Sequence, residues 1–174
     1  MKATAEAGSN IAFVKYWGVR ADCPIHRTFL SLSVSMTLAG VWIRTTVSFE
    51  ETAARDTCTV DGMPLRGEGL ERVTGVLDRI RAAAGLTRFA RVVSRNDFPM
   101  SAGIASSASG FAALAAAASR AAGLSCERPD LAPLAILGSG SACRSLLGGF
   151  VLWPPPASPG EASRVEQVVP EQDW

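Results

Sequence analysis

The chain has 174 residues, of which 48% are hydrophobic and 19% are charged, and its formal net charge is +1 at pH 7. This length suits a single globular domain with its own apolar core. Proteins that bind nucleic acid normally carry clustered basic residues, so the near-neutral charge gives no reason to expect such binding.

Cysteine spacing and hydropathy argue against zinc-binding, disulfide-rich, membrane-spanning and secreted proteins. Cys23, Cys58, Cys126 and Cys143 form no CxxC pair, so neither a zinc site nor a disulfide framework is predicted. No apolar run reaches the ~18 residues of a membrane-spanning helix, and the opening MKATAEAGSN lacks the apolar core of a signal peptide. We therefore expect a soluble, cytoplasmic protein that does not bind membranes.

The first half of the chain predicts strands around one helix. Residues 3–17 have extended, β-rich character, and residues 41–49 alternate with a period of two, which is typical of a strand. Residues 58–62 predict a short strand that ends in a turn. A helix follows, because one face collects Leu70, Val73, Val76, Leu77 and Ile80.

The second half predicts more helix. Expected strands are 89–94 and 150–153; expected helices are 104–122, which ends at Gly123, 129–137 and 141–147. This mixed order predicts an α+β fold. The proline-rich residues 154–160 predict a connector, and 164–169 predict the beginning of another strand. We expect one domain over residues 1–153, with a linker and the start of a second half over 154–174.

Residues 138–145, GSGSACRS, place one arginine among glycines and small hydroxyl residues. Arg144 offers a planar fork of donors that suits phosphate or carboxylate, and the nearby serines add short neutral donors. The alternative is a tight helix start whose serines cap backbone groups.

A second segment rich in small residues, 98–111, runs into the alanine-rich stretch 112–122. A glycine- and serine-rich turn that opens a helix presents unpaired N–H groups and the positive end of the helix dipole, which favours phosphate. The alternative is a turn that lets a helix pack closely on a sheet. No lysine follows the glycine, so this is not a GxxxxGK[ST] loop, and a metal ion would have to compensate charge.

Four segments in order carry a family resemblance. They are NIAFVKYWG at 10–18, SVSMTL at 33–38, NDFPMSAGIASSASGF at 96–111 and GSGSACRSLLGGFVLW at 138–153. Together they resemble the diphosphomevalonate decarboxylase family of the GHMP kinase superfamily, over about residues 9–153.

The resemblance implies a GHMP-kinase N-terminal-type two-layer sandwich, in which a mixed, mainly antiparallel sheet packs on helices. It implies an ATP-dependent enzyme with Mg²⁺ in the mevalonate pathway of isoprenoid and sterol biosynthesis. That enzyme phosphorylates the 3-hydroxyl of diphosphomevalonate, after which phosphate and carbon dioxide leave and isopentenyl diphosphate forms. The family is commonly dimeric, so a homodimer is also expected.

The resemblance also implies site residues. Catalytic roles fall to Lys15, Ser141 and Arg144. Substrate contacts fall to Tyr16, Trp17, Gly18, Ser139, Gly140, Ser141, Ala142, Cys143 and Arg144, with Arg144 on the carboxylate. ATP contacts fall to Ser101, Gly103, Ala105, Ser106, Ser107, Ala108 and Ser109, with Ser107 as the Mg²⁺ ligand. We expect the two serine-bearing segments to converge, so that nucleotide and substrate lie head to head.

Plainer interpretations stay open for several of these residues. Lys15 also suits a surface position at a strand end, and Tyr16 and Trp17 also suit a core. Cys143 suits a small buried hydrophobe better than a nucleophile.

The sequence also departs from the family pattern. Val19 stands where the family has a lysine. Arg20 suits either a displaced substitute for a diphosphate contact or a solvated surface charge. The catalytic aspartate motif of the family's C-terminal half has no match here, so we expect this chain alone to turn over poorly or not at all. Two alternatives therefore remain: a relative that acts on phosphomevalonate or phosphorylates mevalonate, and a truncated nucleotide-binding protein without catalysis.

Overall fold

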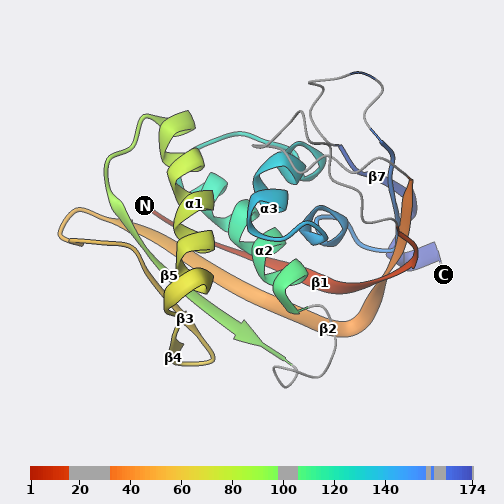
Figure 1. Ribbon diagram of the computed structural model, residues 1–174, viewed down its shortest axis with the longest axis horizontal. Coiled ribbons are helices and arrows are strands. Elements are labelled where there is room, and N and C mark those ends of the chain that lie inside the picture. The colour runs from red at the N-terminus through yellow and green to blue at the C-terminus, as the bar shows by residue number, and fades with distance from the viewer. Residues whose placement is uncertain (16–31, 98–105, 156–157, 159–163, 174) are drawn as a thin grey trace.

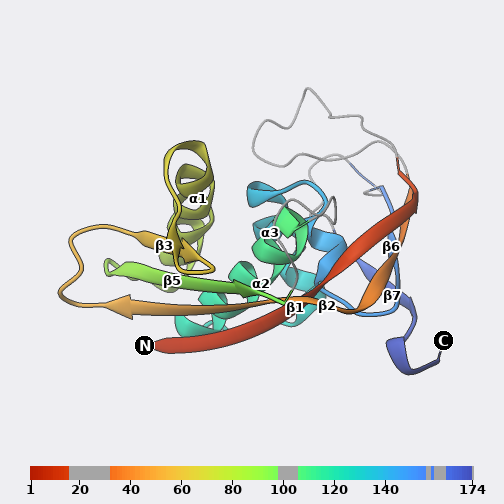
Figure 2. The ribbon, with the colours of Figure 1, turned by 90° about the horizontal axis from the view of Figure 1, so that it is seen from below.

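A curved seven-stranded sheet carries helices α1, α2 and α3 on one face (Figures 1 and 2). The computed structural model describes residues 1–15, 32–97, 106–155, 158 and 164–173. The strands are β1 (Lys2–Val14), β2 (Ser33–Glu50), β3 (Thr57–Val60), β4 (Met63–Pro64), β5 (Phe89–Asn96), β6 (Phe150–Trp153) and β7 (Glu166–Val169). The α-helices are α1 (Gly67–Ala84), α2 (Ser106–Ala121) and α3 (Ala132–Gly138), and 3₁₀ turns span Arg128–Leu131, Ala142–Ser145 and Glu171–Asp173. The predicted α+β class is confirmed.

Strand β2 organises the sheet. Its second half pairs antiparallel with β5, its first residues pair antiparallel with β6, and β1 runs antiparallel along its other side. Between the two halves, Gly40 adopts the left-handed φ of 69°, which costs glycine little. The bend brings the β6 end of the sheet round toward the helices, as Figure 2 shows.

The sequence predicted only the second half of β2. Its alternation is confirmed, because Ile43, Thr45, Val47 and Phe49 are all buried. The first half was not predicted, since its buried positions carry Ser33, Ser35 and Thr37 in place of apolar side chains. Polar residues facing inward hide a strand from hydropathy patterns.

The helices pack as their patterns predict. Val73, Val76, Leu77 and Ile80 of α1 are buried at 5% exposure or less. Helix α2 contacts β1, β2 and both other helices, and seven of its eleven buried residues are alanine, which lets it lie close to the sheet. It ends where predicted, since Gly123 has a φ of 80° and its N–H donates to the Arg120 carbonyl.

Two predicted helices differ in form. Residues 129–137 divide into a 3₁₀ turn and α3, and residues 141–147 form only a 3₁₀ turn over Ala142–Ser145. Both turns are short, as the poorer geometry of i→i+3 bonds requires. Strand β7 pairs with β6. The domain boundary expected after residue 153 stays a prediction. None of the helices in the described part of the chain has the length and apolar character to cross a bilayer.

A buried ion pair ties α1 to the sheet. Arg81 donates from Nη1 and Nη2 to the two Asp56 carboxylate oxygens, each at 2.8 Å, and Asp56 also accepts from the Ala90 N–H at 2.7 Å. The side chain of Asp56 is 3% exposed, whereas Asp78, the second partner of Arg81, is 61% exposed. The hydrogen bond to Asp56 and burial act on the Arg81 pKa in opposite directions, and the net effect raises it.

We predict that Asp56→Ala lowers the free energy of unfolding by about 3–5 kcal/mol, because it removes the buried partner of Arg81 and leaves only the exposed Asp78. Asp78→Ala is the matched control and should cost no more than about 1 kcal/mol, since its carboxylate is in water. Urea denaturation followed by circular dichroism measures both. Equal losses in the two variants would contradict the assignment.

Cys58 lies 5% exposed on β3, and burial raises the pKa of its thiol from 9.0 to about 11. Below pH 9 the thiol is neutral in both folded and unfolded chains, so it contributes no pH dependence. Above pH 9 the unfolded chain ionises first, and stability is lost as pH rises toward the folded pKa.

We therefore predict that Cys58→Val removes a pH dependence of about 2 kcal/mol between pH 8 and pH 11. The measurement is the difference in unfolding free energy between wild type and variant across that range, in which other titrating groups cancel. A difference that does not change with pH would overturn the prediction.

Candidate functional site

Arg144 lies 5% exposed in the 3₁₀ turn Ala142–Ser145, held by polar groups from two strands. Its Nη1 donates to Ser33 Oγ of β2 at 2.8 Å, and its Nε donates to Asn10 Oδ1 of β1 at 3.3 Å. Asn10 in turn donates from Nδ2 to Ser145 Oγ at 2.6 Å. The guanidinium therefore has a fixed orientation.

These partners of Arg144 are all neutral. Among the described residues, no carboxylate forms an ion pair with its guanidinium. Burial lowers the pKa of Arg144 from its usual value, which reflects the cost of keeping a cation away from water. A buried cation with neutral partners favours an anionic ligand.

The two serine-bearing segments meet, as the sequence analysis expected. Ser107, in the first turn of α2, and Ser139, which follows α3, lie with their Oγ atoms 3.5 Å apart. The 3₁₀ turn that carries Arg144 packs against α2 and β1. The start of α2 and the Arg144 segment therefore lie next to one another.

Gly138 allows α3 to pack closely against Phe111 of α2. A Cβ atom at this position would lie 1.8 Å from the Cδ1 atom of Phe111, in the ring that α2 places against α3. Only glycine allows this approach. The first glycine of GSGS thus has a structural reason independent of any ligand.

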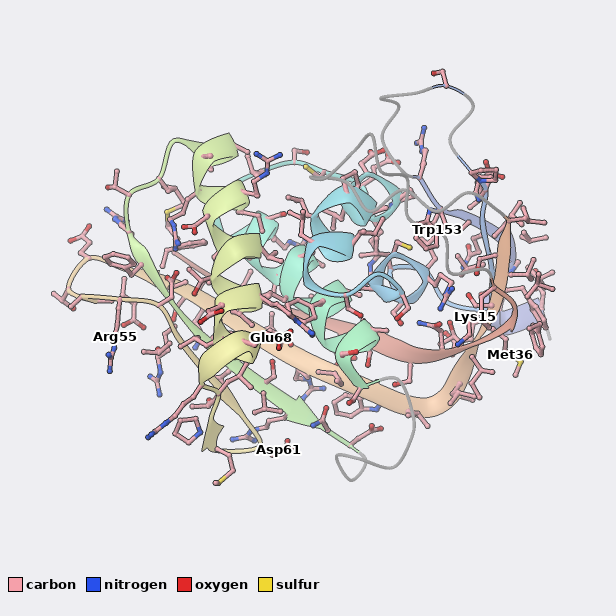
Figure 3. All side chains as sticks on the ribbon, in the orientation of Figure 1. Lys15, Met36, Arg55, Asp61, Glu68 and Trp153 are labelled. Carbon is pink, nitrogen blue, oxygen red and sulfur yellow. The ribbon has the colours of Figure 1, made fainter. Side chains whose placement is uncertain are left out.

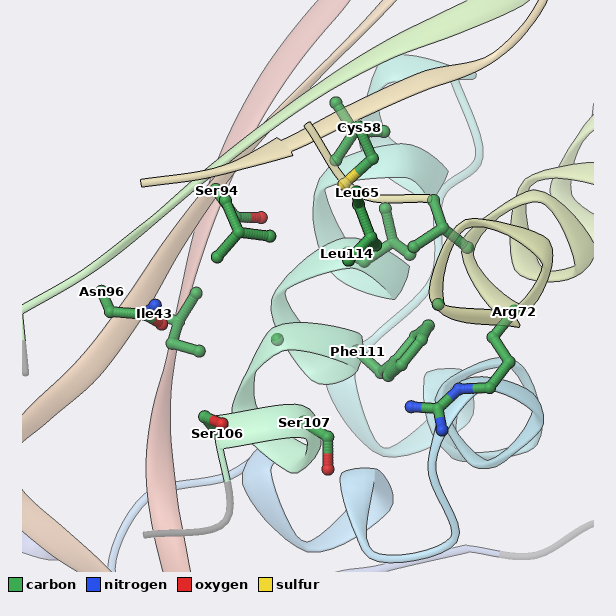
Figure 4. A pocket seen from close by; sticks show the side chains of 15 residues that line it. Ile43, Cys58, Leu65, Arg72, Ser94, Asn96, Ser106, Ser107, Phe111 and Leu114 are labelled. Atoms are coloured by element: carbon green, nitrogen blue, oxygen red, sulfur yellow. The ribbon is translucent and has the colours of Figure 1, made fainter. Parts of the chain in front are cut away.

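A cavity of about 210 Å³ opens beside the start of α2, between the sheet and α1 (Figure 4). Its walls are mainly apolar, with Ile43, Val60, Leu65, Val73 and Leu114 among them. Ser106, Ser107 and Gly110 line the side formed by α2. The cavity thus combines apolar walls with the hydroxyl groups of a helix start.

Three polar residues lining this cavity were missed by the sequence analysis. Asn96 Oδ1 is buried without a hydrogen-bond partner in the described structure, while its Nδ2 donates to Asp61 at 2.7 Å. Arg72 of α1 lies over the Phe111 ring at 5.0 Å, and Ser94 bonds Thr45 at 2.8 Å. Arg72 follows the polar pattern of an exposed helix face, so no local signal marked it.

Lys15 is exposed and directly follows β1 (Figure 3). Val14 pairs with Val34, so Lys15 lies at the end of the sheet where β2 begins with Ser33. Since Ser33 accepts from Arg144, the register places the lysine at the same end as the buried arginine.

The remaining predicted residues divide into three groups. Ser106, Ser107, Ser139, Gly140 and Ser141 are exposed or partly exposed beside the site. Ala108, Ser109, Ala142 and Cys143 are fully buried, and their side chains form the packing beneath it. Tyr16, Trp17, Gly18, Ser101, Gly103 and Ala105, like Val19 and Arg20, lie outside the described residues.

Two of the buried side chains have clear structural roles. Ser109 Oγ lies 3.2 Å from Ser9 Oγ and 3.3 Å from the Ser106 carbonyl, which links α2 to β1. Burial raises the pKa of the Cys143 thiol well above its ordinary value, against the effect of the Arg144 charge. Cys143 is therefore protonated and packs as a small hydrophobic residue.

Within the described ranges, no cluster of three or more histidine, cysteine, aspartate or glutamate side chains is arranged to hold a metal ion. Ser106 and Ser107 offer hydroxyl oxygens, which are hard ligands of the kind Mg²⁺ accepts. Mg²⁺ commonly takes few protein ligands and fills its coordination with phosphate oxygens and water. The residues present therefore fit a Mg²⁺ ion that arrives with a phosphate ligand.

Sequence comparison identifies relatives of the chain. Residues 7–164 match the family described as diphosphomevalonate decarboxylase-like N-terminal domain. Phosphomevalonate decarboxylase of Haloferax volcanii is 40% identical over 153 residues, which cover 86% of this chain and 46% of the relative. Diphosphomevalonate decarboxylase of Homo sapiens is 36% identical over 186 residues, which cover 98% of this chain and 46% of the relative. The chain thus spans about half the length of these relatives.

Comparison with solved structures points to the same family. Mevalonate diphosphate decarboxylase from Enterococcus faecalis superposes with a TM-score of 0.88 at 39% identity, over 97% of this chain and 51% of that chain. The enzyme from Trypanosoma brucei superposes with a TM-score of 0.87 at 37% identity, over 100% of this chain and 47% of that chain. A further structure, with a TM-score of 0.87 at 39% identity over 97% and 50%, is described as MDDEF in complex with MVAPP, AMPPCP and magnesium. This chain therefore belongs to the diphosphomevalonate decarboxylase family and corresponds to its N-terminal domain.

Proposed function

We propose that this chain forms the nucleotide-binding side, and part of the substrate-binding side, of an ATP-dependent decarboxylase that acts on a phosphorylated mevalonate. The reaction phosphorylates the 3-hydroxyl, after which phosphate and carbon dioxide leave; from diphosphomevalonate this yields isopentenyl diphosphate. The observation that carries the proposal is Arg144, a buried cation with neutral partners, beside the meeting point of Ser107 and Ser139.

The nucleotide binds at the start of α2. Backbone N–H groups and the helix dipole favour phosphate at this end, and Ser106 and Ser107 add hydroxyl donors. The adjoining cavity, with its apolar walls, suits a flat nucleobase. Asn96 Oδ1 is an unused acceptor in the cavity wall and suits the exocyclic amino group of adenine.

Ser107 would hold a Mg²⁺ ion that arrives with the nucleotide. The bound ion would supply positive charge that offsets part of the negative charge on the phosphates. Arg72, which lines the same cavity, supplies a second positive charge for a phosphate group of the nucleotide or substrate.

Arg144 binds the substrate carboxylate and keeps it in one orientation, because Asn10 and Ser33 fix the guanidinium. Ser139 and Ser141 donate to the same end of the substrate. Lys15 follows β1 at the same end of the sheet as Ser33 and stabilises the charge near the 3-hydroxyl. Phosphoryl transfer depends mostly on positioning and electrostatics, which these residues supply.

A phosphomevalonate substrate is the second candidate. It is favoured by the 40% identity to the phosphomevalonate decarboxylase of Haloferax volcanii and by Val19, which stands where the family pattern has lysine. Parallel binding titrations with the mono- and diphosphorylated substrates distinguish the two candidates.

Arg144→Gln should weaken binding of diphosphomevalonate or phosphomevalonate by about tenfold to a hundredfold, because it removes a charge-assisted hydrogen bond. Asn10→Ala keeps the Arg144 charge but removes one hydrogen bond that orients the guanidinium, so we expect substrate affinity to fall about threefold. Titration calorimetry in the presence of MgATP measures both. Arg79→Gln, exposed on α1, is the charge-matched control, and unchanged binding by Arg144→Gln would refute the carboxylate role.

Gly110→Leu should fill the cavity and abolish measurable adenosine binding, because a Cβ at Gly110 already lies 3.7 Å from Ile43. Ser107→Ala should leave adenosine binding unchanged and weaken MgATP binding by about tenfold, since it removes a donor to a charged group. Equilibrium dialysis with both ligands separates the two effects. Adenosine binding that survives Gly110→Leu would place the base elsewhere.

A further inference from the structure

The face of the sheet opposite the helices carries its own pattern of charge. On this face the register aligns Lys2 with Ser48 and Arg91, then Thr4 with Thr46 and Val93, then Glu6 with Arg44 and Arg95. Two rows that contain cations therefore flank a row with hydroxyl groups. The helices pack on the other face, so none of them covers this one (Figure 2).

The cations outnumber the acids. Arg44 Nε donates to Glu6 Oε1 at 2.6 Å, and Glu50 accepts from Ser48 Oγ at 3.0 Å. Lys2, Arg91 and Arg95 are exposed, and in the described parts of the chain no carboxylate lies within ion-pair distance of them.

The arrangement leaves an excess of positive charge, because Glu6 pairs with Arg44 and leaves Arg95 without an acidic partner among the described residues. Arg44 lies directly opposite Arg95 on the neighbouring strand, and like charges in directly opposed pairs destabilise a sheet. Arg44 is also held in place, because its guanidinium lies over the Trp42 ring at 5.0 Å. The pair therefore cannot separate freely through movement of Arg44.

These side chains surround a hollow of about 300 Å³. Its lining consists of Lys2, Arg44, Thr46, Ser48, Arg91, Val93 and Arg95. Only Val93 is apolar, so the hollow does not suit an apolar partner. Its donors suit the oxygens of a phosphate ligand.

We propose that this hollow is a second anion site that binds a diphosphate group. Arg91 and Arg95 lie four residues apart on β5, about 13 Å along the strand. Long side chains close over this span from both ends, and an anion with two linked phosphates engages both rows at once. The site is separate from the one at Arg144, whose partners Asn10 and Ser33 are buried on other parts of β1 and β2.

The test is an NMR titration of the 174-residue chain with inorganic pyrophosphate, followed through backbone amide shifts. The expected result is saturable shifts at Thr46, Val93 and Arg95. Arg91→Gln/Arg95→Gln should weaken this binding by about tenfold or more. The charge-matched control Arg79→Gln/Arg120→Gln should leave it unchanged.

A second arm uses an alkyl diphosphate, which distinguishes a free diphosphate from an esterified one; saturable binding of either supports the site. Sodium sulfate at equal ionic strength tests for simple screening. The proposal is overturned if sulfate produces the same shifts, if pyrophosphate shifts only amides near Ser107, Ser139 and Arg144, or if shifts on this face depend on protein concentration alone. Loss of nucleotide binding in the Ser107→Ala variant would not affect this readout.

Discussion

The burial of Arg144 against amide and hydroxyl groups is the constraint on which the site depends. A guanidinium inside a protein needs partners, and a carboxylate partner would neutralise it before any ligand arrived. Here the partners are Asn10, Ser33 and, through Asn10, Ser145, which orient the charge without cancelling it. Two strands and a 3₁₀ turn meet to provide them, so the position of this one cation depends on how three separate segments pack.

Small residues make this meeting possible. Gly138 admits the Phe111 ring, and the alanines of α2 let the helix lie close against β1 and β2. This close packing brings Ser107 to Ser139, while a cavity lies where α2 borders residues of α1 and β3. The same segments that resemble a phosphate-binding motif therefore also set the spacing of the layers.

Much of the fold could be predicted from local patterns. The alternation of 41–49, the apolar face of α1 and the glycine after α2 each have a direct physical signature, and each prediction is confirmed. The family motifs led to Arg144, Ser107 and Ser139. The sequence could not reveal the first half of β2, because its inward side chains are Ser33, Ser35 and Thr37, nor Arg72 and Asn96, whose position in the cavity depends on how distant elements pack.

The alanine-rich interface of α2 has an evolutionary consequence. Ala108, Ala113, Ala115, Ala117 and Ala118 are completely enclosed, and any added methyl group at these positions must push the helix away from the sheet. Divergence within this helix is therefore restricted to its few accessible positions. Substitutions that enlarge a side chain therefore fit better in the surrounding loops and at the rims of the site than within the helix.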